Sequence, residues 1–274
     1  MNDFYAKTIA WAVLLSAPAA VFARAYTPLA NVTYDPEYDV FYQQQFHPLF
    51  DRIQTSVPRA YERVTRMWGL DYPGLLHPLT VQVKQIPSDT LRRWKAAYVE
   101  ARGQGDSLRQ TLVVDIGCYM QNPHEDLDRL VTHEMAHVIL QDVQAVPQAA
   151  PIPAWFNEGL AQSVTREGHQ RVRADREMLG DSGESLVLCD LDGPVDEFAH
   201  GPYNASCYPE YYLAVQRLKQ KGGPETLGKI MRGLQHGTKL PELLPSLIGM
   251  DWPAFKKDVE NYTRDVFSGA KSIP

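Results

Sequence analysis

Residues 130–143 have the sequence LVTHEMAHVILQDV and contain two histidines, His133 and His137, four positions apart. Apolar residues recur around them at helical spacing, which predicts a helix. Residues four apart on an α-helix differ by about 40° in azimuth and about one turn in height, so both imidazoles are expected to face the same point. Glu134 follows His133 directly and is expected beside that point. The predicted buried stripe of this helix is Leu127, Leu130, Val131, Val138 and Ile139.

Two imidazoles on one rigid helix face supply half of a tetrahedral zinc shell, and a third protein ligand is needed. Glu158 lies 21 residues after His137 in WFNEGLA (155–161), an apolar stretch where an unpaired buried charge would be costly. We therefore predict one zinc ion bound by His133, His137 and Glu158, with Glu134 as the general base for a metal-activated water. The alternatives are a chance H-E-x-x-H and a solvent-facing Glu158.

The two motifs together, H-E-M-A-H and W-F-N-E-G-L-A, resemble the paired active-site helices of the gluzincin metallopeptidases. That family includes thermolysin-like enzymes, the zinc aminopeptidases and the peptidase MA-like group. The resemblance runs from about Leu79 to the C-terminus and implies an α+β, zincin-like fold with a small mixed sheet and the same ligands and base. It also implies that the strand at residues 111–116 is the edge along which an extended substrate pairs.

The resemblance further implies a tyrosine that stabilises the developing oxyanion, and Tyr208 aligns best. Tyr211 and Tyr212 lie close by and are expected to be packing residues. The family's aminopeptidase motif Gly-x-Met-Glu-Asn is missing, which disfavours exopeptidase action. The thermolysin-like aspartate after the third ligand is replaced by Gln162, so the partners of the histidines stay open, with Asp142 and Asn157 as candidates.

Hydrophobic patterning and Gly/Pro positions predict the remaining elements. The histidine helix is expected to begin near Pro123, with Asn122 as its cap and Glu125 at the capping-box position, and to end before Pro147. The other expectations are a helix within 38–69, strands at 79–85 and 111–116, a loop with a short helix at 86–110, a helix at 154–165, a surface insertion at 166–206 and three or four short helices from 208 onward. This pattern favours one α+β domain over 26–274, with a helical C-terminal subdomain at about 207–274.

Residues 1–25 resemble a signal peptide, because Lys7 precedes a 15-residue apolar stretch and small residues then stand at cleavage-type spacing. An uncleaved anchor and a buried helix are the alternatives; the stretch is shorter than the roughly 20 residues of a membrane span. A periplasmic or extracellular protein is expected. Oxidation would then pair Cys189 with Cys207 across an irregular segment, while Cys118 is packed.

The 274 residues carry a formal charge of -6 and no basic run, so nucleic acid is not an expected partner. The expected function is a zinc-dependent peptidase, an endopeptidase, with a peptide or protein substrate and no stable membrane span after signal removal. The alternative is a zinc-stabilised peptide-binding or scaffold protein of the cell envelope, and Glu134 argues against it because a structural site needs no base. The other histidines, His47, His77, His124, His169 and His200, occur singly and are expected at the surface or in caps.

Overall fold

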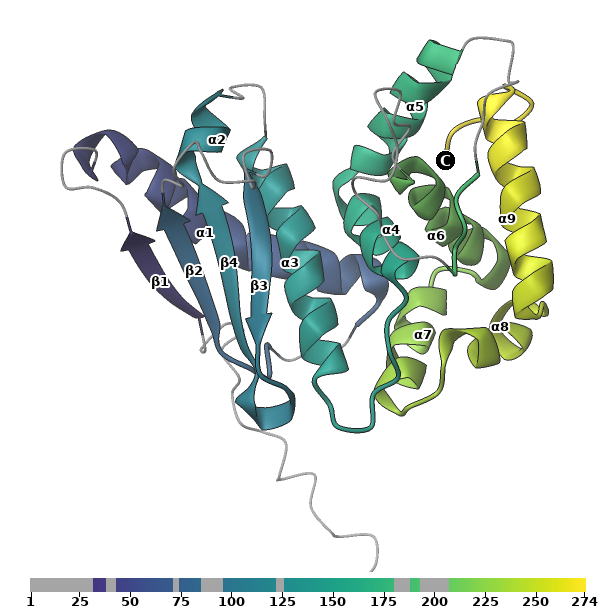
Figure 1. The fold of residues 1–274 in the computed structure, drawn as a ribbon, viewed down its shortest axis with the longest axis horizontal. Coiled ribbons are helices and arrows are strands. Elements are labelled where there is room, and N and C mark those ends of the chain that lie inside the picture. The colour runs from purple at the N-terminus through teal and green to yellow at the C-terminus, as the bar shows by residue number, and fades with distance from the viewer. Residues whose placement is uncertain are drawn as a thin grey trace, which may run out of the picture.

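The computed structural model describes residues 32–37, 43–70, 74–84, 96–121, 126–179, 188–192 and 207–274. The predicted signal peptide therefore lies outside the described residues. Figure 1 shows a sheet with two long helices behind it, followed by a half of the molecule made of helices alone. The coarse fold class predicted from the sequence, α+β with a small mixed sheet, is confirmed at that level.

The sheet has four strands in the order β1-β2-β4-β3. Strands β1 (Val32–Glu37), β2 (Leu79–Lys84) and β4 (Arg109–Asp115) are parallel, and β3 (Ala97–Arg102) pairs antiparallel with β4. Period-two patterning correctly predicted β2, where every second residue from Leu79 is fully buried. The prediction that residues 86–110 form a loop with a short helix was wrong over β3, but a short 3-10 helix is present at Gly105–Ser107, and residues 86–95 lie outside the described residues.

The predicted role of the strand at 111–116 as the sheet edge was also wrong. This strand, β4, lies between β2 and β3, so the edges of the described sheet are β1 and β3. Leu112, Val113 and Val114 are completely buried, as suits an interior strand covered on both faces. The hairpin from β3 to β4 turns at Gly103 and Gly105, both with positive φ, and adds the outer strand that the sequence pattern did not reveal.

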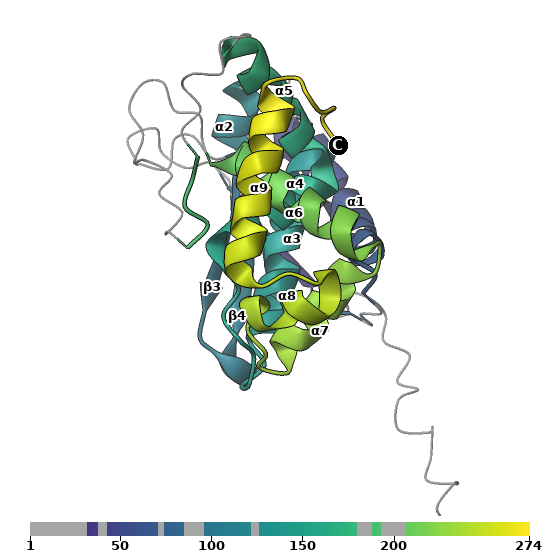
Figure 2. The same cartoon turned by 90° about the vertical axis from the view of Figure 1, so that its right-hand side faces the viewer.

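Helices α1 (Gln43–Trp68) and α3 (Leu127–Gln144) lie together along one face of the sheet (Figures 1 and 2). Apolar residues of α1 from Ile53 to Trp68 are buried at the predicted helical spacing, and the helix continues through Pro48 and Pro58. Along α3, the predicted stripe is fully buried except at Leu130, which is partly buried. These contacts fix the helix that carries the two histidines.

The start of the histidine helix differs from the prediction near Pro123. Helix α3 begins at Leu127, and Asp126 is its N-cap, with its carboxylate accepting a hydrogen bond from the Asp128 amide at 3.0 Å. Residues 122–125, including the proposed cap Asn122 and Glu125, lie outside the described residues. A separate short helix, α2 (Ile116–Gln121), follows β4 instead. The end of α3 at Gln144 agrees with the predicted stop before Pro147.

The helical half consists of α4 (Ala154–Thr165), α5 (Glu167–Leu179), α6 (Tyr208–Gly222), α7 (Thr226–Gln235), α8 (Leu240–Ile248) and α9 (Trp252–Phe267). The predicted bounds of α4 are confirmed, as are the four helices from 208 onward. The segment 166–206, predicted as a surface insertion without clear periodicity, begins with α5, a partly exposed helix of 13 residues. Residues 180–187 and 193–206 of that segment lie outside the described part of the chain.

The predicted disulfide between Cys189 and Cys207 is present, and Cys118 is free and buried. The bond joins the start of α6 to residues 188–192, which we call the strap. The Cys189 amide donates to Glu210 Oε2 at 2.6 Å, and Asp192 accepts from the Trp252 indole at 2.9 Å and pairs with Lys256. The strap is thus tied to both α6 and α9. Within the described residues, no helix has the length and hydropathy needed to cross a membrane.

Stability should fall as pH rises through the titration of Glu210, whose side chain is nearly inaccessible to solvent. Burial raises the pKa of Glu210 from 4.5 to about 7, Glu260 adds to the rise, and the Cys189 amide and Arg264 oppose it. Between these pKa values the folded protein holds a proton that the unfolded chain has released, so the free energy of unfolding decreases with pH. Glutamine does not titrate, so this decrease should be missing in Glu210→Gln. Its free energy of unfolding should therefore rise by about 3 kcal/mol relative to that of wild type between pH 4.5 and pH 8. Urea unfolding at several pH values measures it.

The control for Glu210 is the exposed Glu242 on α8. Glu242→Gln should follow the wild-type curve at every pH. A constant difference between Glu210→Gln and wild type across the range would show that Glu210 does not carry the dependence.

Candidate metal centre

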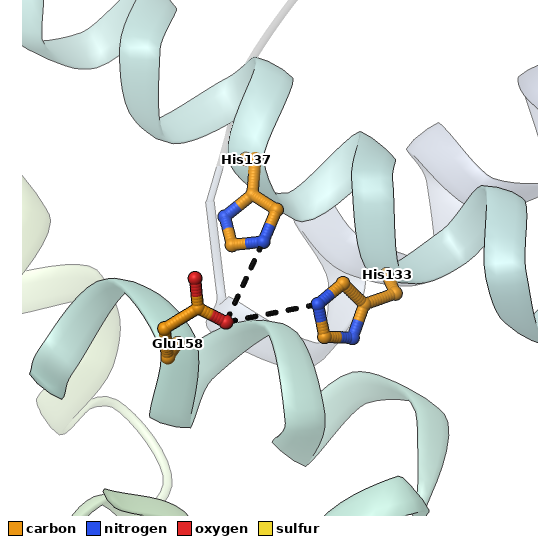
Figure 3. Close-up of side chains that lie close together, drawn as sticks. All are labelled: His133, His137 and Glu158. Carbon is orange, nitrogen blue, oxygen red and sulfur yellow. Dashed lines mark ion pairs between the residues drawn. The ribbon is translucent and has the colours of Figure 1, made fainter. Parts of the chain in front are cut away.

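His133, His137 and Glu158 converge from two packed helices. His133 and His137 lie one turn apart on α3, and Glu158 faces them from α4 (Figure 3). Glu158 Oε2 lies 3.8 Å from Nε2 of each histidine. One ligand atom from each residue lies within 4.8 Å of the other two, and this is the only such group of three found among the described residues. The structure therefore brings together the three predicted metal ligands.

The donor set and its spacing fit a zinc ion. Two ligands at about 2.0–2.2 Å from a tetrahedral zinc ion lie roughly 3.3–3.6 Å from one another, close to the 3.8 Å seen here. Two imidazole nitrogens with one carboxylate oxygen is a ligand combination of catalytic zinc sites. The side chains of His133, His137 and Glu158 keep 16%, 12% and 17% of their surface exposed, so the group is partly open to solvent.

Asn157 orients His137. Its Oδ1 atom lies 2.9 Å from His137 Nδ1, so the ring donates from Nδ1 and leaves Nε2 free to bind a metal. Asn157 was one of two predicted partners. The other, Asp142, is fully buried and accepts from the amides of Leu76 and His77 and from His77 Nδ1 at 2.6 Å. Asp142 therefore fixes the chain before β2 to α3.

Glu167 and Arg171 are the residues that the sequence analysis missed. Glu167 Oε2 lies 3.1 Å from His133 Nδ1, and Glu167 Oε1 accepts from Arg171 Nη2 at 2.6 Å and from Nε at 2.9 Å. The available signal was a Glu-x-x-x-Arg spacing at the start of a polar segment, which is typical of a surface helix. Gln162, in the position where thermolysin-like enzymes carry an aspartate, is buried in α4.

The environment of the His133 imidazole favours positive charge. Burial opposes protonation of His133, but the Glu167 carboxylate 3.1 Å from Nδ1 and the charges of Glu134 and Glu158 outweigh it and raise the pKa of His133 to about 9. Burial also disfavours the charged form of Glu167, yet His133 and Arg171 hold the pKa of that carboxyl well below its ordinary value. An environment that stabilises an imidazolium also stabilises a divalent cation held by the same imidazole.

Glu134 is buried on α3, with a side chain close enough to His133 for its charge to act on that ring. Tyr208 begins α6, with its ring centroid 5.3 Å from the Arg171 guanidinium carbon and 6.5 Å from the Tyr211 ring. Tyr211 is buried, and its pKa is raised by burial and by the charges of Glu210, Glu158 and Asp190. Tyr212 is also buried, as predicted for both residues, and donates to the Pro274 carbonyl at 2.7 Å.

Gly159 lets α6 approach α4 beside the centre. A Cβ atom on Gly159 would lie 2.3 Å from the Tyr211 carbonyl oxygen and 2.8 Å from the Val215 side chain, closer than real Cβ atoms come. Asn157, Glu158 and Gly159 therefore differ in what they contact: Asn157 bonds to His137, Glu158 completes the group of three possible metal ligands, and Gly159 leaves room for the helix that carries the tyrosines. These different contacts explain why the three residue types stand together in the sequence.

Of the other histidines, His77 is buried against Asp142, against the expectation of a surface or cap position, and His47 lies 3.8 Å from Asp51 on exposed α1 surface. His124 and His200 lie outside the described residues. Comparisons with protein-family models, with curated proteins and with solved structures find no match to this chain.

Proposed function

We propose that this protein is a zinc-dependent endopeptidase of the gluzincin, zincin-like type. The observation that supports it most directly is the convergence of Glu158 on both histidines, with the buried Glu134 one residue after His133. The three side chains are partly exposed, and the chain carries a carboxylate beside them that can act as a base. A metal site that served folding alone would need no such carboxylate.

Each residue of the proposed site has its own role in peptide hydrolysis. A zinc ion held by His133, His137 and Glu158 would supply a Lewis acid for the scissile carbonyl and lower the pKa of a nearby water. Glu134 takes the proton from the attacking water and passes it to the leaving amine. Tyr208 donates a hydrogen bond to the oxygen that becomes negative as the carbonyl carbon turns tetrahedral.

Strand β3 is the better candidate for substrate pairing than β4. Among the described strands, β1 and β3 each pair with one neighbour, and an edge strand is where a further strand can add by backbone hydrogen bonds. Strand β3 lies next to α3, the helix of His133 and His137, in Figure 1, and packs against it. A peptide added to β3 by backbone hydrogen bonds would therefore run along the side of the sheet nearest the metal centre.

Removal of the metal tests the proposal. The purified chain is expected to contain about one zinc per molecule by elemental analysis and to cleave an unfolded protein such as casein at internal bonds. Dialysis against a chelator should abolish cleavage, and added zinc should restore it. Cleavage that persists after complete metal removal would contradict the zinc mechanism, and a zinc-loaded chain that cleaves no member of a peptide library would favour the scaffold alternative.

A further inference from the structure

The chain turns sharply between α4 and α5, at Arg166. Its φ is 62° and ψ is 9°, and it is the only residue other than glycine with a positive φ in the described parts of the chain. A side chain in this left-handed conformation costs about 1–2 kcal/mol. Across this turn, the Thr165 hydroxyl accepts a hydrogen bond from the Glu167 amide at 3.2 Å. The turn is thus strained, and the hydrogen bond between Thr165 and Glu167 stabilises it.

The turn at Arg166 places the first residue of α5, Glu167, against α3, the helix that carries both histidines. Its carboxylate lies 3.1 Å from His133 Nδ1, the nitrogen opposite the one that faces Glu158. Gly168 lets α5 press against α6, since a Cβ atom there would lie 2.2 Å from Cγ of Tyr212. The position of Glu167 is therefore determined by a strained turn on one side and by close helix packing on the other.

Arg171, one turn further along α5, extends this contact to α6. Its guanidinium donates twice to Glu167 Oε1 and lies over the ring of Tyr208, 5.3 Å from the centroid. Such a cation above an aromatic face is attractive by about 0.5–2 kcal/mol. Glu167 and Arg171 together therefore touch a proposed metal ligand on α3 and the proposed oxyanion tyrosine on α6.

We propose that Glu167 and Arg171 are positioning residues for this centre, Glu167 by holding His133 with Nε2 toward the metal and Arg171 by holding both Glu167 and Tyr208. Glu167 lies 3.1 Å from His133 Nδ1 as an ion-pair partner, whereas Asn157 accepts a hydrogen bond from His137 Nδ1, so each histidine has its own polar partner from the helical half. The inference rests on the proposed function, because it assumes a metal at His133, His137 and Glu158.

Helix α5 contains its own matched control. Arg173 and Glu177 also form an i,i+4 pair, at 2.8 Å, but their side chains are 70% and 64% exposed and the pair joins α5 to no other element in the contacts described. Glu167 is only 17% exposed. If the Glu167–Arg171 pair merely supported the helix, both pairs would contribute the few tenths of a kcal/mol typical of surface pairs.

Metal affinity tests the role of Glu167. Zinc dissociation constants are measured by competition with a chromophoric chelator, and the visible spectrum of the cobalt(II) form reports ligand geometry. Glu167→Gln and Glu167→Ala should raise the zinc Kd about 10- to 100-fold and alter the cobalt spectrum. Arg171→Met should cause a smaller rise of several fold. Glu177→Gln and Arg173→Met should stay within twofold of wild type.

The outcomes separate this inference from the proposed function. A wild-type chain that binds neither zinc nor cobalt overturns both. A wild-type chain that binds zinc, with Glu167→Gln within twofold of it, overturns the positioning role alone. Circular dichroism of the metal-free variants checks folding; if Glu167→Gln is unfolded, Arg171→Lys, which keeps the charge but loses the planar fork, is measured instead, and an unchanged cobalt spectrum and zinc Kd overturn the role.

The link to Tyr208 is tested by combining substitutions. Tyr208→Phe and Arg171→Met should each lower kcat for a peptide substrate, and the double variant should be within twofold of Tyr208→Phe alone, because Arg171 then has no hydroxyl left to position. Independent, multiplying effects would show that Arg171 does not act through Tyr208.

Discussion

Glu134→Gln is expected to keep one zinc per chain and to lower kcat for peptide cleavage by about 10²–10⁴-fold, the usual contribution of a general base. Glu134 is buried on α3 beside His133, and glutamine has nearly the same shape, so the helix and the three metal ligands should be undisturbed. The amide cannot accept a proton from the attacking water. The loss should therefore appear in kcat at unchanged metal content, measured by peptide hydrolysis and elemental analysis on the same sample.

Glu177→Gln is the control for Glu134→Gln, since it makes the same chemical change at an exposed position of α5. Its kcat should equal that of wild type. If Glu134→Gln turns over within twofold of wild type, the base assignment is wrong, and if it loses its zinc instead, Glu134 helps to hold the metal.

Prediction from sequence worked where the information was local. His133 and His137 face one point because of helix geometry alone, and the bounds of α4 follow from Pro153 and the apolar stretch after it. The strand β2 alternates cleanly because one face is buried and the other partly exposed. The proximity of Glu158 to both histidines was expected because a carboxylate in an apolar helix needs a partner, and the histidines were the partners to expect.

Prediction failed where contacts distant in sequence decide the structure. Strand β3 has one strongly buried end, at Ala97, and an exposed end, so it shows neither alternation nor an apolar run; its pairing with β4 defines it. Among the described residues of α5 only Gly168 and Val172 are buried. The helix therefore shows almost no periodic pattern of apolar residues that the sequence analysis could detect. Glu167 reaches His133 because Arg166 adopts a left-handed conformation that its residue type disfavours.

The substitution Glu158→Ala should weaken zinc binding by about 10²–10⁴-fold, more than any change among the orienting residues. Zinc sites in small proteins contribute roughly 10–16 kcal/mol, so the loss of one of three protein ligands removes about a third, or 3–5 kcal/mol. Among the described residues, no other carboxylate forms a metal-compatible group of three with His133 and His137. Chelator competition measures the Kd, and peptide cleavage at low free zinc should fall with it.

A buried carboxylate with a purely structural role provides the contrast to Glu158. Asp142 accepts from two backbone amides and from His77 at full burial, so Asp142→Asn should lower the free energy of unfolding by about 1–3 kcal/mol while the folded protein keeps its zinc affinity. Glu158, with its side chain facing two imidazoles and partly open to solvent, should show the reverse: little change in the unfolding of the metal-free chain and a large change in Kd. Full zinc retention in Glu158→Ala would remove this residue from the metal ligands, and since no other described carboxylate approaches both Nε2 atoms, the hydrolase proposal would fall with it.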